Sequence, residues 1–317
     1  MVHEYPEYLD EFECIGGHCT DTCCSGWEFD IDPETAEIYK ELPGEDGEYV
    51  RSKLTHSEDG SLCIRPVDGG RCPFLNERNL CDLILKYGDN VLSDPCAEYP
   101  RYYTDYGDYE AVDMSLSCKE VGRLFFTRDG RPTVYKKVED DMVGDALSAD
   151  EKSRLAERIK VRDGMIREIY SKSEELFIND AGFLKSDEDE AIFSKLCELE
   201  YYHYRWDEYL KKLSEARPVI EERSQEFFDA GREDILRWFR YFSEYLVYRY
   251  TLSDLAAGVP IEDTMRFIKR SLRIVYMALC FRWIASGESD VESMIDIAHY
   301  YSKEVEHNLW NVATLRE

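Results

Sequence analysis

The sequence predicts a mainly α-helical protein, with an irregular, cysteine-rich metal-binding region at the N-terminus followed by a helical, bundle-like region. Two observations lead to this prediction. Nine of the 11 cysteines lie between Cys14 and Cys118, in a segment that is rich in Gly, Pro and Tyr and has no long periodic stretches. Beyond this segment, apolar residues recur with the spacing of one helix face, after recognisable helix-start signals. We therefore divide the chain into residues 1–125 and 126–317.

The first region is expected to contain only short elements, such as a helix over Pro33–Leu42. A segment of this composition makes a weak hydrophobic core, and a bound metal would supply the missing stability. At the transition between the regions, Arg128–Arg131 predicts a turn and Thr133–Val138 predicts a strand.

The second region is expected to form five helices. Ser148 and Glu151 have the spacing of a capping box, as do Ser289 and Glu292. Pro260 occupies the first-turn position at which proline favours a helix start. The helices are expected over about residues 148–177, 188–213, 219–255, 260–286 and 289–314.

An aromatic stripe with helical spacing lies in the third of these helices. We interpret it as core packing rather than as the lining of a pocket. Cys197 and Cys280 each sit alone in a helical pattern and are expected in the core. The stripe consists of Trp238, Phe239, Phe242, Tyr245, Leu246 and Arg249.

The formal net charge is −28 and the pI is about 4.6. This acidity argues against nucleic acid as the main partner, because phosphate binding needs clustered Lys and Arg. It also disfavours binding to anionic membrane surfaces. An acidic surface attracts a cationic partner, such as a protein surface that carries lysines.

The cellular compartment determines whether clustered cysteines indicate disulfides or metal ligands. The segment Met1–Tyr5 lacks the basic and apolar stretches of a signal peptide, and the longest apolar run, around Ile274–Phe281, is too short to span a bilayer. We therefore expect a soluble, cytoplasmic protein with no membrane insertion. In a reducing compartment, clustered cysteines indicate metal ligands or catalysis rather than disulfides.

The cysteines form a constellation with ligand-like spacing. Thiolates suit both zinc and iron–sulfur clusters, and a short spacing such as Cys19-x3-Cys23 lets one loop supply two ligands. Neighbouring side chains diverge, so Cys23 and Cys24 cannot easily bind one metal together. The motifs lie in residues 12–27, 71–75, 80–84, 96–101 and 115–120.

Missing motifs disfavour several enzyme classes. A radical S-adenosylmethionine enzyme usually shows C-x3-C-x2-C, and the third position here is Gly26. The chain has neither a C-x2-C in a βαβ setting nor a glycine pattern of the Rossmann or P-loop type. The six histidines form no H-x3-H pair, and we interpret His18 as a solvent-exposed loop residue.

The motif string as a whole resembles the flagellin lysine N-methylase family. The resemblance rests on F-x-C-I-G-x2-C-x-D-T-C-C-x-G-W from Phe12, followed by C-P-F-L-N, L-C-x-L, C-x2-Y-P-R and S-L-S-C-x-E. The tail Glu304–Asn308 is also similar to the C-terminal signature of that family. The first half further resembles a broader group of zinc- or iron-chelating cysteine-cluster domains.

The resemblance implies a protein-lysine N-methyltransferase that uses S-adenosylmethionine to methylate flagellin and carries a cysteine-held [4Fe-4S] cluster, with zinc as the alternative metal. A single cluster needs only four ligands. Cys63 lies outside the family pattern and is expected to be a small core residue. The implied candidate ligands are Cys14, Cys19, Cys23, Cys24, Cys72, Cys81, Cys96 and Cys118.

Methyl transfer to lysine requires a neutral amine, so such an enzyme must desolvate the amine or accept its proton. Several residues near the cysteine loops could accept this proton, and the sequence gives no way to rank them. Alternatively, they form a solvated acidic loop with no part in the reaction. They are Tyr99, Tyr102, Tyr103, Asp105 and Glu110.

Two other functions stay open. One is a non-enzymatic zinc- or iron-binding module with a helical interaction domain, which the cysteine density and the missing nucleotide motif favour. The other is a structural-zinc protein whose acidic helical region docks a basic partner. Within the methylase reading, the partner is flagellin or another lysine-bearing protein.

Overall fold

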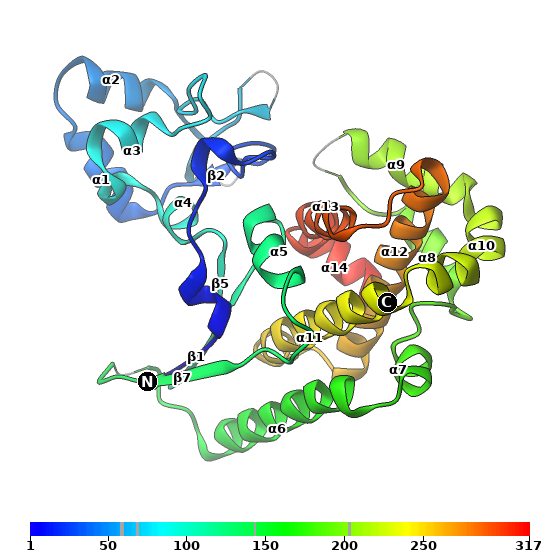
Figure 1. Ribbon diagram of the computed structural model, residues 1–317. Helices are drawn as coiled ribbons and strands as arrows, with labels where there is room; N and C mark the ends of the chain where they lie inside the picture. Colours follow the sequence, from blue (N-terminus) through cyan, green and yellow to red (C-terminus); the bar gives the residue numbers. More distant parts are fainter. Residues whose placement is uncertain (58–59, 68–69, 143, 202–203) are drawn as a thin grey trace. The chain divides into compact units, whose positions relative to one another are not determined.

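The computed structural model describes residues 1–57, 60–67, 70–142, 144–201 and 204–317. The described part contains fourteen α-helices and seven short strands, which confirms a mainly α protein (Figure 1). The chain forms two compact units. We call Glu13–Arg101 the cysteine-rich unit, and Met1–Phe12 together with Tyr102–Glu317 the helical unit. This division differs from the predicted one at residue 125, which followed composition alone.

The cysteine-rich unit is built from short elements. Its strands form one antiparallel sheet in the order β2-β4-β3. The predicted helix at residue 33 is confirmed as α1. Asp32 caps this helix, because its side chain accepts a hydrogen bond from the Thr35 N–H at 2.8 Å. The elements are η2 Gly16–His18, β2 Phe29–Asp30, α1 Pro33–Glu41, α2 Gly44–Ser52, β3 Leu54–His56, β4 Leu62–Ile64, α3 Asp82–Tyr87, η4 Asp89–Val91 and α4 Asp94–Glu98.

The helical unit contains a four-stranded sheet in the order β5-β6-β1-β7. Strand β1 pairs in parallel with β6 and antiparallel with β7, so the start of the chain is a central strand of this sheet. The predicted strand at residue 133 is observed as β7, shifted by two residues at its start. The strands are β1 Val2–Pro6, β5 Arg101–Tyr106, β6 Tyr109–Met114 and β7 Tyr135–Glu139, and a 3-10 helix, η1 Glu7–Glu11, follows β1.

The five predicted helical segments are all helical, but four of them are divided. The helices of this unit are α5 Lys119–Phe126, α6 Ala149–Ser171, α7 Glu174–Ala181, α8 Asp189–Leu196, α9 Tyr204–Glu215, α10 Arg217–Ala230, α11 Arg232–Ala256, α12 Ile261–Ser286, α13 Val291–Tyr301, the π-helix η5 Ser302–Glu306 and α14 Leu309–Arg316.

Local caps explain the divisions. The segment from residue 148 breaks after α6 because Lys172 is extended and Ser173 caps a new helix. Gly231 separates α10 from α11. The capping box at Ser148 is confirmed. The one predicted at Ser289 is wrong, because the cap is Asp290, which accepts from the Ser293 N–H at 2.9 Å. The segment over 188–213 forms α8 and α9, and its residues 202–203 lie outside the described ones.

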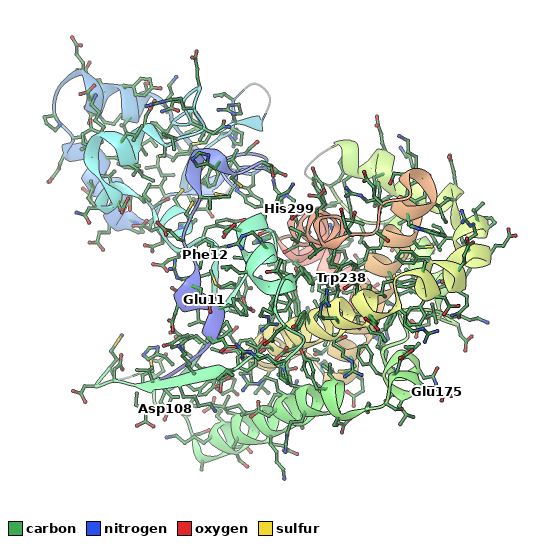
Figure 2. The ribbon with its side chains drawn as sticks, viewed as in Figure 1. Glu11, Phe12, Asp108, Glu175, Trp238 and His299 are labelled. Atoms are coloured by element: carbon green, nitrogen blue, oxygen red, sulfur yellow. The ribbon has the colours of Figure 1, made fainter. Side chains whose placement is uncertain are left out.

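Helix α11 lies in the middle of the helical unit, where it packs against α6 and α12 (Figure 1). The predicted packing role of the aromatic stripe is confirmed, because all six of its side chains are buried. Figure 2 shows Trp238 of this stripe and His299 of α13 within the unit. None of the helices in the described ranges is both long and apolar enough to cross a bilayer.

A buried arginine joins α12 to the connection between α7 and α8. Arg273 is 2% exposed, and its guanidinium donates to the carbonyls of Phe183 and Leu184 at 3.0 and 2.9 Å. It also donates to both carboxylate oxygens of Asp189, at 2.8 and 2.7 Å. One side chain thus supplies donors to four oxygen atoms, namely two carbonyls of the connection and the carboxylate of the first residue of α8.

We predict that Arg273→Met lowers the free energy of unfolding of the helical unit by about 3–5 kcal/mol, because it leaves a buried carboxylate and two carbonyls without donors. Urea unfolding followed by circular dichroism measures this. The control is Arg154→Met, which removes an exposed pair with Asp150 and should change the free energy by about 0.5 kcal/mol or less. Equal effects of both substitutions would contradict the prediction.

Candidate functional site

Backbone pairing brings the first cysteine segment of the cysteine-rich unit against the second. The Cys72 N–H donates to the Cys24 carbonyl at 2.9 Å, and the Gly26 N–H donates to the Gly70 carbonyl at 2.8 Å. Ser25 and Arg71 form the bridge between these two bonds. Segments that lie nearly fifty residues apart in the sequence therefore present Cys24 and Cys72 side by side.

A tight hairpin then brings Cys81 to Cys72. The Asp82 N–H donates to the Phe74 carbonyl at 2.8 Å, and Leu75 and Cys81 form a bridge. The turn is held by Asn76, whose side-chain oxygen accepts from the N–H groups of Arg78 and Leu80 at 2.9 and 3.1 Å. Local side-chain-to-backbone bonding of this kind is typical of Asn in turns.

Cys96 is positioned by a different device. It lies in α4, whose N-terminal Asp94 N–H donates to a carboxylate oxygen of Asp32 at 3.0 Å. The other oxygen of Asp32 caps α1, so one side chain fixes α4 against α1. Cys72, Cys81 and Cys96 all pack against the small core of this unit, which consists of Phe29, Ile31, Tyr39, Val50, Ile64, Phe74, Leu83 and Val91.

The electrostatics show that four thiols share one neighbourhood. Burial raises the pKa of Cys72 to about 12 and that of Cys96 to about 11, and it also raises the pKa of Cys81. Negative charge on Cys24 raises all three of these pKa values further, so Cys24, Cys72, Cys81 and Cys96 lie within electrostatic range of one another. A hydrogen bond with Cys23 lowers the pKa of Cys24 itself to about 7.

The residue type of this set, though not its spacing, suits a thiophilic metal. The thiols come from four separate segments, and backbone N–H groups point at two of them: that of Phe74 at Cys72, and those of Leu83 and Ile84 at Cys81. Donors of this kind stabilise thiolates and tune iron–sulfur centres. Within the described ranges, no group of three or more Cys, His, Asp or Glu side chains stands in a tight metal-binding arrangement. The ligand set of eight cysteines therefore stays a prediction.

The remaining cysteines occupy other settings. Cys14 is exposed, and the thiol of Cys19 donates to the Asp21 carbonyl at 3.1 Å. Cys118 belongs to the helical unit, where it precedes α5. Cys63 and Cys280 are buried as expected, whereas the expectation for Cys197 is wrong. Cys197 is exposed because α8 ends at Leu196, so that Cys197 follows the helix and does not lie on its buried face.

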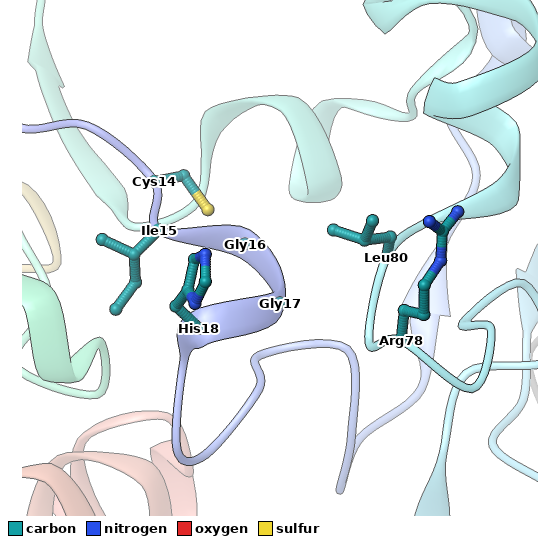
Figure 3. A pocket seen from close by; sticks show the side chains of 7 residues that line it. All are labelled: Cys14, Ile15, Gly16, Gly17, His18, Arg78 and Leu80. Carbon is teal, nitrogen blue, oxygen red and sulfur yellow. The ribbon is translucent and has the colours of Figure 1, made fainter.

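The turn that follows Cys14 lines a surface hollow of about 340 Å³ (Figure 3). Cys14, Gly16 and His18 face Arg78 and Leu80 of the hairpin across it. Both glycines of the turn are needed. Gly16 has a φ of +52°, and a Cβ on Gly17 would lie 2.5 Å from the Arg78 carbonyl oxygen.

A second constellation lies in the helical unit and was not predicted. We call it the Arg249 cluster, and it comprises Asp113, Tyr245, Arg249, Tyr250 and Glu306. Arg249 donates to Asp113 at 3.0 Å and lies 3.8 Å from a carboxylate oxygen of Glu306. The hydroxyls of Tyr245 and Tyr250 donate to Glu306 at 3.1 Å. All five residues are buried.

A serine–histidine network adjoins this cluster. Nε2 of His307 lies 2.9 Å from the hydroxyls of both Ser115 and Ser117. His299 donates from Nδ1 to the Ser117 carbonyl at 2.7 Å. Burial lowers the pKa of His307 to about 3, so its imidazole is neutral. The π-helix Ser302–Glu306 carries Glu306 to this place, and π-helical turns are frequent at functional sites.

In the sequence these motifs support the family resemblance, and Cys118 is a candidate ligand, but no role was predicted for the serines, for Glu306 or for His307. S-L-S-C-x-E and Glu304–Asn308 lie almost two hundred residues apart, and only the fold joins them. Four of the five proton-handling candidates named from the sequence lie elsewhere. The predicted residue Glu110 pairs with His3 at 2.8 Å, Tyr99 packs on Trp27, and Tyr103 and Asp105 are exposed. Among them, Tyr102 contacts the Arg249 cluster.

We predict that Asp113 makes the helical unit more stable as the pH falls. Burial raises the pKa of Asp113 to about 6, so the folded state binds this proton more tightly than the unfolded state. The ionised carboxylate therefore costs stability above pH 6, and the free energy of unfolding recovers as the pH falls towards 4. Urea unfolding between pH 4.5 and 7.5 should show this change, of about 2 kcal/mol, because about 1.5 pH units of the titration fall within this range.

Asp113→Asn should remove the slope and leave the protein at least as stable as the wild type at pH 7.5. Asp290→Asn is a control of opposite sign, because hydrogen bonds from Ser293 lower the pKa of Asp290. A large loss of stability in Asp113→Asn at pH 7.5 would contradict the prediction.

Comparison with known proteins gives three relatives. A segment of 124 residues, 37% of this chain, is 31% identical to the flagellar biosynthetic protein FliU of Salmonella muenchen and covers 72% of that protein. The Lysine-N-methylases of Salmonella typhimurium and Salmonella choleraesuis are also 31% identical over 124 residues. No family model matches the chain, and no solved structure matches it.

The matched segment spans 30% of the length of the two Lysine-N-methylases. It spans more than two thirds of FliU, at an identity that indicates common descent. The chain belongs to the flagellin lysine N-methylase family.

Proposed function

We propose that the protein is an S-adenosylmethionine-dependent protein-lysine N-methyltransferase that acts on flagellin and carries a cysteine-held [4Fe-4S] centre. The observation that carries this proposal is membership of a family whose relatives include two proteins named Lysine-N-methylase and one flagellar biosynthetic protein. We further propose that the protein works in the cytoplasm, where its substrate is available before export.

The donor chemistry of the cysteine-rich unit supports the metal centre. Cys24, Cys72, Cys81 and Cys96 would hold it, since these are the four thiols that share one neighbourhood. Cys23 would then act through its hydrogen bond with Cys24, in agreement with the divergence of vicinal side chains. When bound, such a centre supplies a redox-active, Lewis-acidic group. The backbone N–H groups of Phe74, Leu83 and Ile84 would stabilise its thiolates.

The surface charge supports a cationic protein substrate. With a net charge of −28, the chain draws a lysine-bearing surface towards it over distances comparable to the Debye length. Long-range attraction of this kind raises the association rate and weakens with salt. It does not select flagellin among lysine-rich proteins, so the target rests on the names of the relatives.

The test begins with protein purified without oxygen. Iron, zinc and acid-labile sulfide are measured per chain, and transfer of labelled methyl from S-adenosylmethionine to flagellin is then assayed. We expect about four irons and four sulfides, with label on flagellin lysines. Zinc without sulfide, together with no transfer to flagellin or to any other lysine-rich protein, would instead support the non-enzymatic binding module.

Cysteine variants test the ligand assignment. Cys72→Ser and Cys81→Ser should each lose most of the iron and the sulfide, because a serine hydroxyl is a poor ligand for a thiophilic metal. Cys14→Ser and Cys197→Ser are controls with exposed thiols and should retain both. Full iron content in Cys72→Ser, or its loss in Cys14→Ser, would show that a different set of cysteines holds the cluster.

A further inference from the structure

The first turn of helix α14 presents two large apolar side chains to solvent. Leu309 is 82% exposed and Trp310 is 60% exposed, and Leu309 is the most exposed large apolar residue of the described ranges. The helix buries its opposite face, because Val312 and Leu315 belong to the hydrophobic core. Most of the apolar area of Leu309 and Trp310 therefore stays in water, where it contributes no stability to this fold.

A third exposed apolar side chain is held beside this turn by Asn311. The side-chain oxygen of Asn311 accepts a hydrogen bond from the Glu200 N–H, and its side-chain nitrogen donates to the Glu200 carbonyl, both at 2.8 Å. Tyr201 follows Glu200 directly and is 51% exposed. These bonds bring Tyr201 to the first turn of α14, although Glu200 and Asn311 are 111 residues apart in the sequence. We call Tyr201, Leu309 and Trp310 the α14 patch.

The charged group next to the patch is a carboxylate. One carboxylate oxygen of Glu200 accepts a hydrogen bond from the Asn308 side-chain amide at 3.2 Å, and no basic side chain pairs with Glu200 in the part of the chain that the structure describes. Lys195, which precedes this segment, is already paired with Glu198 and Glu317, at 3.9 and 3.0 Å. The patch is therefore bordered by an uncompensated negative charge, in a chain whose net charge is −28.

Exposed apolar side chains beside an unpaired carboxylate suit a partner that carries both apolar and basic side chains. Burying Leu309 and Trp310 would supply the favourable free energy, and tryptophan is enriched among the residues that dominate protein interfaces. A lysine or arginine of the partner would pair with Glu200, and aromatic rings attract such a cation as well. A second copy of this chain is a poor occupant, because two chains of charge −28 repel each other.

We propose that the α14 patch docks the lysine-bearing protein substrate, with apolar side chains of that protein against Trp310 and Leu309 and a basic side chain against Glu200. This inference rests on the proposed methylation, because it assigns a binding surface to the substrate of that reaction. The patch takes no part in the chemical step. Docking holds the substrate protein at the enzyme equally before and during methyl transfer, so it lowers KM rather than raising kcat.

Helix α7 offers matched controls for the test. Its Leu176 is 56% exposed and lies in the first turn of a helix of the same length as α14. The exposed Glu175, labelled in Figure 2, precedes it. Leu309→Ala and Leu176→Ala remove the same atoms. Glu200→Gln and Glu175→Gln remove the same charge. Because all four side chains lie at the surface, each variant should keep its fold and its midpoint of urea unfolding.

Binding of monomeric flagellin to the full chain is measured by biolayer interferometry without S-adenosylmethionine, at about 50 and about 500 mM NaCl. We expect Trp310→Ala to weaken binding by about 10-fold or more at both salt concentrations, and Leu309→Ala by about 3-fold or more. Glu200→Gln should slow association at the lower salt concentration and have little effect at the higher one, because salt screens its charge. Leu176→Ala and Glu175→Gln should bind like the wild type.

Methylation kinetics distinguish a docking surface from a structural one. Trp310→Ala should raise KM for flagellin by about the factor by which it weakens binding, whereas kcat should change far less. If the side chain only stabilised the fold, the substitution would lower kcat and the midpoint of urea unfolding instead, and this result would overturn the inference.

The binding measurement also separates this inference from the proposed function. If flagellin binds with the expected pattern but receives no methyl group, the methylation proposal fails and the docking surface stands. If the wild type and Trp310→Ala bind flagellin alike, or if the wild type does not bind it, the docking inference fails. Sedimentation velocity tests the other occupant. Self-association of the wild type that Trp310→Ala abolishes would show that a second copy covers the patch, which would also overturn the inference.

Discussion

The helical unit depends on the burial of the middle of helix α11. From Phe239 to Leu252 this helix has no solvent-facing side apart from one half-buried residue, so its polar side chains must find partners inside the protein. Glu244 accepts hydrogen bonds from Tyr170 on α6 and from the Thr133 N–H ahead of β7. Arg249 joins β6 to the π-helix, and each of these partners lies far away in the sequence.

The burial also explains why distant motifs meet. Arg249 needs carboxylates on the segments that pack around it, and the chain supplies Asp113 from β6 and Glu306 from η5. The same packing places Ser115 and Ser117 beside His307. Two short motifs that look unrelated in the sequence are therefore joined through the polar requirements of one buried helix. An arrangement with surplus buried charge costs stability, which is a frequent property of functional sites.

The cysteine-rich unit differs from the helical unit, because its hydrophobic core is small. Among its described residues, eight buried side chains form the hydrophobic core, and the strands are only two or three residues long. The unit is organised by a few backbone bonds and by turns that gather thiols from four segments around that core. In small domains with few apolar residues, a bound metal commonly contributes part of the folding free energy. The two units thus rely on different sources of order, namely extensive apolar packing in one, and backbone hydrogen bonds and turns around a small core in the other.

The sequence by itself determined the class, the helical segments and the family, because apolar period, capping residues and cysteine spacing are local signals. It also determined that Trp238 and its neighbours pack in a core. Sequence analysis missed the helix breaks at Lys172 and Gly231. The capping signals at these two positions are weaker than the apolar periodicity that continues through them. Only the tertiary structure shows that β1 belongs to the helical unit. The strands with which β1 pairs are distant in the sequence, and composition does not reveal them. The tertiary structure alone likewise assembled the Arg249 cluster, since buried charges choose partners by distance in space, which sequence spacing does not reveal.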